Sequence, residues 1–576
     1  MTVTQIGLLL ASINSFLFLF FFITDSYPLF LIIIHIVSLI LFWSWIINRT
    51  TCSLFFKKNR WDIAIMILIF IAGLAIRLYR VDQITPGMWG DEVGYAILGE
   101  QVVDAHMLTP FTPDLFAPPT PFFYIIGWTV KTLGRTLITV RLPALIFGAL
   151  GVVMGYRLLR SIFSRKIALM GTLVMLVLYH HLIISRFAYE MSAAVFFEFL
   201  TIFFLYRAYR SDDLRDYTGT VFSLAAGLYS YVAFRTNAIA FMVVVTLLIL
   251  RRKDHLLQNI IRLGLVYVLF FVSLTPWLAF SLRHPDHVMA RAKAISVFHQ
   301  GFSAQRTITE ILGSARNSLG MFFITGDPNP RQNPSHVAMY DPVFVSISLI
   351  GVWYLVRKQK KLAIAGLFFM IPSFVNDIFS IELFPEFHFA GTGHPSATRV
   401  LGLIPIMIVF FSAGFSFLER VSFFNKGKGR YIGWIISGSL VAITVFINWR
   451  LYFNQPPSEF IYKANKVQMI DAVTFINRAA TFNTFTVAMS DSIFNDQRVQ
   501  YFSDPKVKRI SLKPESGEIT IDQIPLGIYT LIDTSTAPVL SEKLIQGKFQ
   551  REHNLEVNGI PTVWKTVNTL IVFRKG

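Results

Sequence analysis

Two adjacent carboxylates, Asp91 and Glu92, are the residues of this chain that most plainly suggest chemistry. They follow a long apolar segment, Trp61 to Tyr79, which is long enough to cross a membrane. Acids placed where a helix leaves the bilayer are costly unless a function needs them, and one such carboxylate can serve as a general base for a hydroxyl group. The alternative is that the acids only stabilise the first turn of a helix starting near Val93.

Further polar residues lie where other predicted membrane helices end. Arg186 and Glu190 share a turn between two spans and could line a cavity, or form an i, i+4 ion pair if the turn is helical. Arg235 follows Tyr229 and Tyr231 at another helix end. Arginine is well suited to binding phosphate, although a side chain that reaches toward lipid headgroups is an ordinary alternative.

Two other polar stretches carry weaker signals. Turn chemistry alone explains the composition of Gly326 to Pro334. Between Ile381 and Thr398 the spacing of the histidines and glutamates matches no tight metal motif, so we expect no metal and no other cofactor, with a divalent ion left as an open alternative. The possible ligands of such an ion are His388, His394, Glu382 and Glu386.

The composition indicates a membrane protein. The chain has 576 residues, of which 54% are hydrophobic and only 15% charged. Apolar runs with helical periodicity recur along most of it, and we predict about thirteen transmembrane helices in a unit spanning residues 1–453. The first run, Ile6 to Phe22, lacks the basic start and the cleavage site of a signal peptide, so we count it as a span.

The basic connectors between spans predict the topology. Lysine and arginine cluster in alternate short connectors, for example Arg49 to Arg60 and Arg357 to Lys361, which the positive-inside rule places in the cytoplasm. The N-terminus is then cytoplasmic, and residues 81–135, 283–340 and the tail lie outside. The net charge of +18 is largely explained by these connectors, so we expect no nucleic-acid partner.

The tail, residues 454–576, is predicted to be a small extracytoplasmic α/β domain. It follows a shift in composition at Asn454 to Ser458 and alternates helix-like with strand-like pieces. The single cysteine, Cys52, can form no disulfide within the chain. The helix-like pieces are Ala464 to Ala479 and Val539 to Gly547, and the strand-like ones are Thr484 to Met489, Gly527 to Ile532 and Leu570 to Phe573.

Both long outer loops contain amphipathic stretches, Tyr95 to Met107 in the first and Val288 to His299 in the second. Such stretches tend to lie in the membrane interface. Trp89, beside the acidic pair, offers an aromatic surface able to cover a sugar ring. Two interfacial loops beside a membrane cavity suit a substrate that is half lipid.

Taken together, several short motifs resemble the membrane glycosyltransferases of the GT-C type, in particular the protein O-mannosyltransferase and aminoarabinose transferase superfamily and its bacterial members of undefined acceptor. Each motif is weak alone, but their order and their place on the outer face are similar to that superfamily. The motifs are Trp89-Gly90-Asp91-Glu92, Pro118-Pro119, the turn from Ser185 to Glu190, and Gly227-Leu228-Tyr229 leading to Arg235.

The resemblance implies transfer of a sugar from a polyprenyl-phosphate carrier to a protein, lipid or glycan acceptor on the outer face of the plasma (inner) membrane. Asp91 matches the catalytic acid of the first outer loop, Glu190 a second cavity acid, and Arg235 a phosphate-binding arginine. Relatives often carry a lysine just before the Pro-Pro pair, where this chain has Ala117. Phosphate binding is then expected to rely on Arg235, Arg186 or Arg291.

The residues therefore predict Asp91 and Glu92 as catalytic and a substrate-binding set of Trp89, Arg186, Glu190, Tyr231, Arg235 and Arg291. Two other functions stay open. A transporter or flippase of a lipid-linked saccharide would also have polar residues among its helices, although no paired halves with broken helices are visible. An oligosaccharide transferase or ligase acting en bloc is the second alternative.

Overall fold

The structure is a computed structural model of the whole chain. Two parts of the sequence prediction fall outside the residues that it describes: the first two predicted spans (apart from Val37) with Cys52, and the possible metal ligands between Glu382 and His394. The described residues are Val37, 60–106, 109–112, 118–251, 256–329, 334, 336–381, 395–421, 427–457, 461–462, 465–480, 486–512, 528–533, 555–559 and 570–575.

The chain divides into two compact units, and each is described by itself. The first comprises Met1–Tyr79, Val102–Ile125 and Leu142–Gln455, and the second comprises Arg80–Gln101, Ile126–Arg141 and Pro456–Gly576. The second unit thus includes the predicted C-terminal domain together with the segment that carries Asp91 and Glu92.

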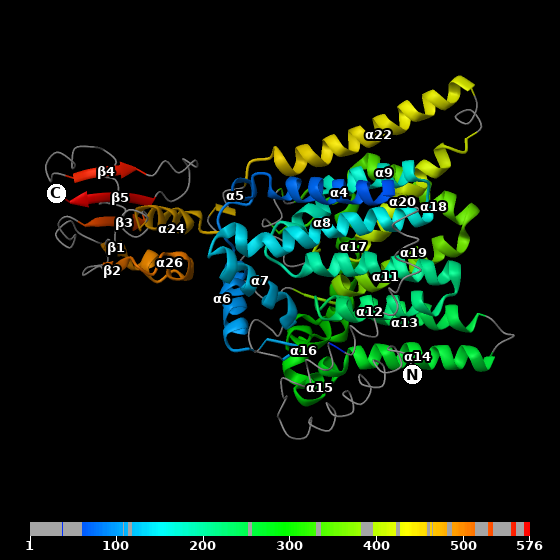
Figure 1. Ribbon diagram of the computed structural model, residues 1–576, viewed down its shortest axis with the longest axis horizontal. Helices are drawn as coiled ribbons and strands as arrows, with labels where there is room; N and C mark the ends of the chain where they lie inside the picture. The colour runs from blue at the N-terminus through cyan, green and yellow to red at the C-terminus, as the bar shows by residue number, and fades with distance from the viewer. Residues whose placement is uncertain are drawn as a thin grey trace. The chain divides into compact units, whose positions relative to one another are not determined.

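Long apolar helices build the first unit (Figure 1). Among the described residues, six helices are long and apolar enough to cross a membrane, or seven if the bent pair α9 and α10 forms one span. The chain is therefore a multi-pass membrane protein, while the total of about thirteen spans stays a prediction. These helices are α4 (Arg60–Leu78), α8 (Leu137–Ile162), α9 (Arg165–Val177), α10 (Tyr179–Ser185), α11 (Met191–Ser211), α14 (Leu256–Ser273), α19 (Lys360–Ile378) and α22 (Gly427–Phe453).

Four shorter helices complete the packing: α12 (Leu214–Leu228), α13 (Phe234–Leu250), α18 (Pro342–Lys358) and α20 (Leu403–Leu418). Helices α18 and α20 pack closely along their length. At Gly351 an added Cβ would collide with the backbone oxygen of Phe410, and at Gly414 with that of Ile347. Small residues permit this approach, as they commonly do between membrane helices.

The outer loops fold largely as helices. The first predicted outer loop contains α5 (Val81–Ile84), α6 (Gly90–Asp104) and α7 (Thr120–Leu133). The second comes after α15 (Thr275–Arg283) and contains α16 (Pro285–Ile295), η3 (Val297–His299) and α17 (Ala304–Phe323). The described residues of both predicted amphipathic stretches thus contain helical structure. The described part of Gly326 to Pro334 forms no helix or strand.

The tail contains a five-stranded sheet in the order β2-β1-β3-β5-β4. Strand β1 pairs in parallel with β2 and β3, whereas β5 pairs antiparallel with β3 and β4. Helices α24 and α26 accompany the sheet (Figure 1). The bounds are α24 (Val467–Ala480), β1 (Thr486–Ser490), α25 (Asp491–Phe494), α26 (Gln497–Phe502), β2 (Lys508–Leu512), β3 (Tyr529–Asp533), β4 (Leu555–Gly559) and β5 (Leu570–Lys575).

Asp471 on α24 makes the tail's stability depend on pH. Burial raises the pKa of this carboxyl to about 6 from an ordinary value of 3.8. The folded state then holds the proton more tightly than the unfolded state, so stability falls as the pH rises from about 4 to about 6. We expect Asp471→Asn to stabilise the protein at pH 8, by at most about 3 kcal/mol before solvent screening is counted, and to have little effect at pH 4.

Thermal unfolding of the purified protein in detergent checks this expectation, with the variant compared to wild type at each pH. An equal shift in melting temperature at pH 4 and pH 8 would mean that the ionisation of Asp471 is not the cause.

Candidate active site

The acidic pair lies in the first turn of α6, with its two members in opposite environments. Asp91 is exposed, whereas Glu92 is fully buried. Adjacent residues of a helix point about 100° apart, so one can face solvent while the other faces the interior. Glu92 also reaches back to the start of the helix, where its Oε2 accepts a hydrogen bond from the backbone N–H of Trp89 at 3.2 Å. This is one half of a capping box.

Glu92 forms a buried ion pair with Arg141 near the start of α8. The Nε and Nη2 atoms of Arg141 each donate to one carboxylate oxygen of Glu92 at 2.8 Å, and both side chains are fully buried. The remaining donors of Arg141 bind the chain that leads into α6. They reach the backbone oxygens of Val81, Thr85 and Gly87 and the Thr85 hydroxyl, at 2.8–3.0 Å.

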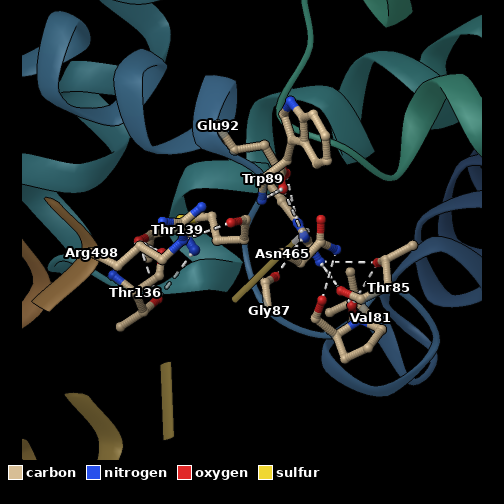
Figure 2. Close-up of polar contacts among 12 residues, drawn as sticks. Val81, Thr85, Gly87, Trp89, Glu92, Thr136, Thr139, Asn465 and Arg498 are labelled. Carbon is tan, nitrogen blue, oxygen red and sulfur yellow. Dashed lines mark hydrogen bonds and ion pairs between the residues drawn. The ribbon is translucent and has the colours of Figure 1, made fainter. Parts of the chain in front are cut away.

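This arrangement satisfies both charges. A buried arginine needs several acceptors and a buried carboxylate needs donors, and here each supplies the other. The segment from Val81 to Glu92 is consequently held to Arg141 near the start of α8. Figure 2 shows Val81, Thr85, Gly87 and Glu92 among these polar contacts. Of the two predicted catalytic acids, Asp91 is the one whose side chain is open to solvent, and Trp89 beside it is partly buried.

In the first unit, Arg186 binds the end of a membrane helix. Its buried guanidinium donates to the backbone oxygens of Tyr79 and Ile76 at 2.9 and 3.3 Å, at the C-terminal end of α4. It also lies 5.2 Å from the ring centroids of Tyr452 and Phe453. Cations stabilise helix C-termini, so part of this side chain's role is structural.

Arg235 is in the first turn of α13 and lies close to two aromatic rings. Its guanidinium carbon is 5.7 Å from the ring centroid of Phe111 and 5.4 Å from that of Trp277, while Nη1 donates to the backbone oxygen of Val288 at 3.2 Å. Phe111 and Val288 belong to the two outer loops. Arg235 therefore joins the first outer loop to the second and is only partly buried.

A polar cluster forms around Tyr231, in the turn before α13. The pKa of the Tyr231 phenol is raised to about 12, chiefly by burial and also by the Glu190 carboxylate, against the opposing effects of Arg291, Arg399 and a hydrogen bond with Thr398. Two predicted site residues, Glu190 and Arg291, thus act electrostatically on a third, Tyr231. Arg399 also bonds the backbone oxygen of Ile381 at 3.4 Å.

Tyr231 and Arg399 also line a small pocket together with Glu198, Asn237 and Asn376. The pocket's volume is about 10 Å³. That is room for about one water molecule. Glu198 accepts a hydrogen bond there from Asn237 Nδ2 at 3.0 Å.

Within the part of the chain that the structure describes, no group of three or more histidine, cysteine, aspartate or glutamate side chains is placed to hold a metal ion. The predicted roles of Asp91, Glu92 and the substrate-binding set stay predictions. Sequence reasoning missed Arg141 and Arg399. The only signal for either is an arginine close to the outer end of a predicted span.

Comparison with known proteins gives one family match. Residues 117–280 match the family model described as dolichyl-phosphate-mannose-protein mannosyltransferase. No curated protein matches the chain.

Several solved structures are similar. ArnT of Cupriavidus metallidurans bound to undecaprenyl phosphate is 11% identical, with a TM-score of 0.49 over 90% of this chain and 98% of that one. The same protein in the apo state is 11% identical, with a TM-score of 0.46 over 89% and 96%. The Archaeoglobus fulgidus oligosaccharyltransferase in its apo form is 13% identical, with a TM-score of 0.42 over 84% and 70%.

The match of residues 117–280 to the dolichyl-phosphate-mannose-protein mannosyltransferase family confirms, over that stretch, the predicted resemblance to the GT-C membrane glycosyltransferases.

Proposed function

We propose that this protein transfers a sugar from a polyprenyl-phosphate-linked donor to a hydroxyl or amine acceptor on the extracytoplasmic face of the membrane. The observation that carries the proposal is the family match over residues 117–280, since dolichyl phosphate is itself a polyprenyl phosphate. A multi-pass membrane unit with apolar helices suits a donor that has a lipid tail.

Asp91 is proposed as the general base. The acceptor's oxygen or nitrogen attacks the anomeric carbon of the sugar, and its proton passes to the Asp91 carboxylate. The bond between the anomeric carbon and the phosphate oxygen breaks, and the electron pair leaves with the polyprenyl phosphate. Asp91 is suited to this role because its side chain is exposed at the first turn of α6, whereas Glu92 is buried in its ion pair with Arg141.

Glu92 is accordingly proposed to act by positioning rather than by touching the substrate. Its capping bond to Trp89 and its ion pair with Arg141 fix the turn on which Asp91 stands. Trp89 is proposed to cover one face of the sugar.

The donor's phosphate is proposed to bind among arginines of the first unit. Arg291 and Arg399 both act electrostatically on Tyr231, so two guanidinium groups accompany its phenol hydroxyl, together with the Glu190 carboxylate. Arginine forks stabilise the negative charge that develops on a departing phosphate. Arg235, held by the rings of Phe111 and Trp277, is a further candidate, and Arg186 contributes by holding the end of α4. Glu190 is proposed to shape the sugar pocket.

Reconstitution into vesicles tests this function against its rivals. We expect the purified protein to release polyprenyl phosphate from a radiolabelled polyprenyl-phosphate sugar only when an acceptor is present, and to do so in EDTA. Passage of the intact donor across the bilayer without bond cleavage would support a transporter or flippase instead. Transfer of a whole oligosaccharide, abolished by chelation, would support the en bloc transferase.

A further inference from the structure

The chain that enters α6 is held by side chains from distant parts of the second unit. Residues 85–88 form neither helix nor strand, so their backbone oxygens need partners from elsewhere. Each of the four consecutive carbonyls accepts a hydrogen bond from a side chain. The donors are Arg141 Nη1 to Thr85 at 2.8 Å, Asn465 Nδ2 to Pro86 at 2.8 Å, Arg141 Nη2 to Gly87 at 3.0 Å and Arg498 Nε to Met88 at 2.8 Å.

Two of these donors, Asn465 and Arg498, belong to the C-terminal domain (Figure 2). Asn465 is both a donor and an acceptor to the segment, since its backbone oxygen also accepts a hydrogen bond from the N–H of Met88 at 3.0 Å. The approach is close: a Cβ on Gly87, whose φ is +69°, would lie 2.6 Å from the Asn465 backbone oxygen. Both Asn465 and Arg498 are buried.

The side chain of Arg498 is itself held in place by a neighbouring carboxylate. Its Nη1 bonds both carboxylate oxygens of Asp496 at 3.2–3.3 Å, and Lys466 Nζ bonds the same carboxylate at 2.9 Å. Burial of Asp496 opposes its charge, but the bond from Lys466 and the charge of Arg498 outweigh that effect and hold its pKa below the usual value. The guanidinium is therefore oriented by a carboxylate that stays ionised at neutral pH.

The body of α6 is tied to the same domain by a second set of contacts. Tyr501 donates from its hydroxyl to the backbone oxygen of Ala96 at 3.1 Å. Arg135 bonds Glu100 through two nitrogens at 2.8 and 3.1 Å, and its guanidinium carbon lies 4.6 Å from the ring centroid of Tyr501. The start and the middle of α6 thus both depend on the segment that contains α26.

We propose that the C-terminal domain is part of the catalytic apparatus, with Asn465 and Arg498 as positioning residues that hold residues 85–88 and so fix Trp89 and Asp91 for reaction. The catalytic role of these residues rests on the proposed function. The contacts that hold residues 85–88 are present whichever reaction the protein catalyses. A general base must lie within hydrogen-bond reach of its proton. Displacement of a reacting group by about 1 Å can lower turnover about a hundredfold.

The first arm of the test measures order in the segment without any assay of activity. Cys52 is the sole cysteine of the chain, so Cys52→Ser with Gly90→Cys allows one spin label at the start of α6. Gly90 is exposed, and an added Cβ meets no atom within 4 Å. In the full-length protein we expect the label to become more mobile on adding Asn465→Asp or Arg498→Met, and to be unaffected by Lys508→Ala. Lys508 is an exposed residue of β2.

The second arm measures kinetics in unlabelled protein. Asn465→Asp has nearly the same shape as the native side chain but replaces the donor to Pro86 with an oxygen. We expect it to lower kcat by about ten- to a hundredfold and to raise the donor KM much less, because only the contact of Trp89 with the sugar is disturbed while the donor's phosphate is assigned to other residues. Lys508→Ala should keep wild-type values.

The outcomes separate the two proposals. An immobile label in both variants overturns the holding contact, and a mobile label with wild-type kcat overturns its catalytic importance. If Arg498→Met does not fold, Asn465→Asp alone decides. A wild type that transfers no sugar in any assay overturns the proposed function, and label mobility then still decides whether the C-terminal domain holds the segment.

Discussion

Asp91→Asn should abolish transfer, lowering kcat by about 10²- to 10⁴-fold, the usual contribution of a positioned general base. Asparagine has nearly the same shape but cannot accept the acceptor's proton. The fold should survive because Asp91 is exposed on the first turn of α6. Loss of one favourable charge at a helix N-terminus is worth only about 0.3–1 kcal/mol. Turnover of a radiolabelled donor in reconstituted vesicles, together with donor binding to the same preparation, measures both halves of this prediction.

The matched control is Asp82→Asn. Asp82 is another exposed acid in the first turn of a helix of the same loop, α5, and it lies before the segment that leads into α6. Its loss should leave turnover unchanged. Near-wild-type turnover by Asp91→Asn, or an equal loss in both variants, would remove Asp91 from the role of base.

Arg141→Met should destabilise the second unit by about 3–5 kcal/mol, because it leaves the Glu92 carboxylate buried without its partner. It also removes the donors to the backbone oxygens of Thr85 and Gly87. Turnover should fall as well, since the turn carrying Asp91 loses its attachment to α8. Thermal unfolding in detergent and hydrogen exchange of the amides of residues 85–92 measure the two effects.

The chain supplies a matched control in Arg135→Met. Arg135 also pairs with a glutamate of α6, Glu100, but its side chain is 47% exposed, so the pair should contribute only about 0–1 kcal/mol. Removing both buried charges at once, with Arg141→Met and Glu92→Leu in one variant, should recover part of the lost stability. Equal destabilisation by Arg141→Met and Arg135→Met would contradict the view that burial makes the first pair essential.

The neighbouring acids Asp91 and Glu92 are thus expected to have different roles. Removal of Asp91 should affect chemistry and spare stability, whereas removal of Glu92 or of its partner should affect stability first and chemistry through it. The difference follows from burial alone, since the two residues carry the same charge on the same helical turn.

Several local features were predictable because they depend on short-range physics. The run Trp61 to Tyr79 is long and apolar enough that a membrane helix was expected, and α4 spans Arg60–Leu78. Of the predicted pieces of the tail, α24, β1, β3 and β5 are present close to their expected places, while Val539 to Gly547 lies outside the described residues. Strands β2 and β4 were missed. Both lie at the edges of the sheet, where pairing with one neighbour matters more than a buried apolar pattern.

The multi-pass membrane character of the chain and the acidic pair just after an apolar segment follow from the order of residues alone, because hydrophobic length is a local property. Which of the two acids is exposed depends on the fold instead, because Glu92 is buried against Arg141, which lies 49 residues away. The fold also decided that the partners of Pro86 and Met88 come from 379 and 410 residues away. No local pattern encodes such pairings, since a buried polar group takes its partner from whichever part of the folded chain packs against it.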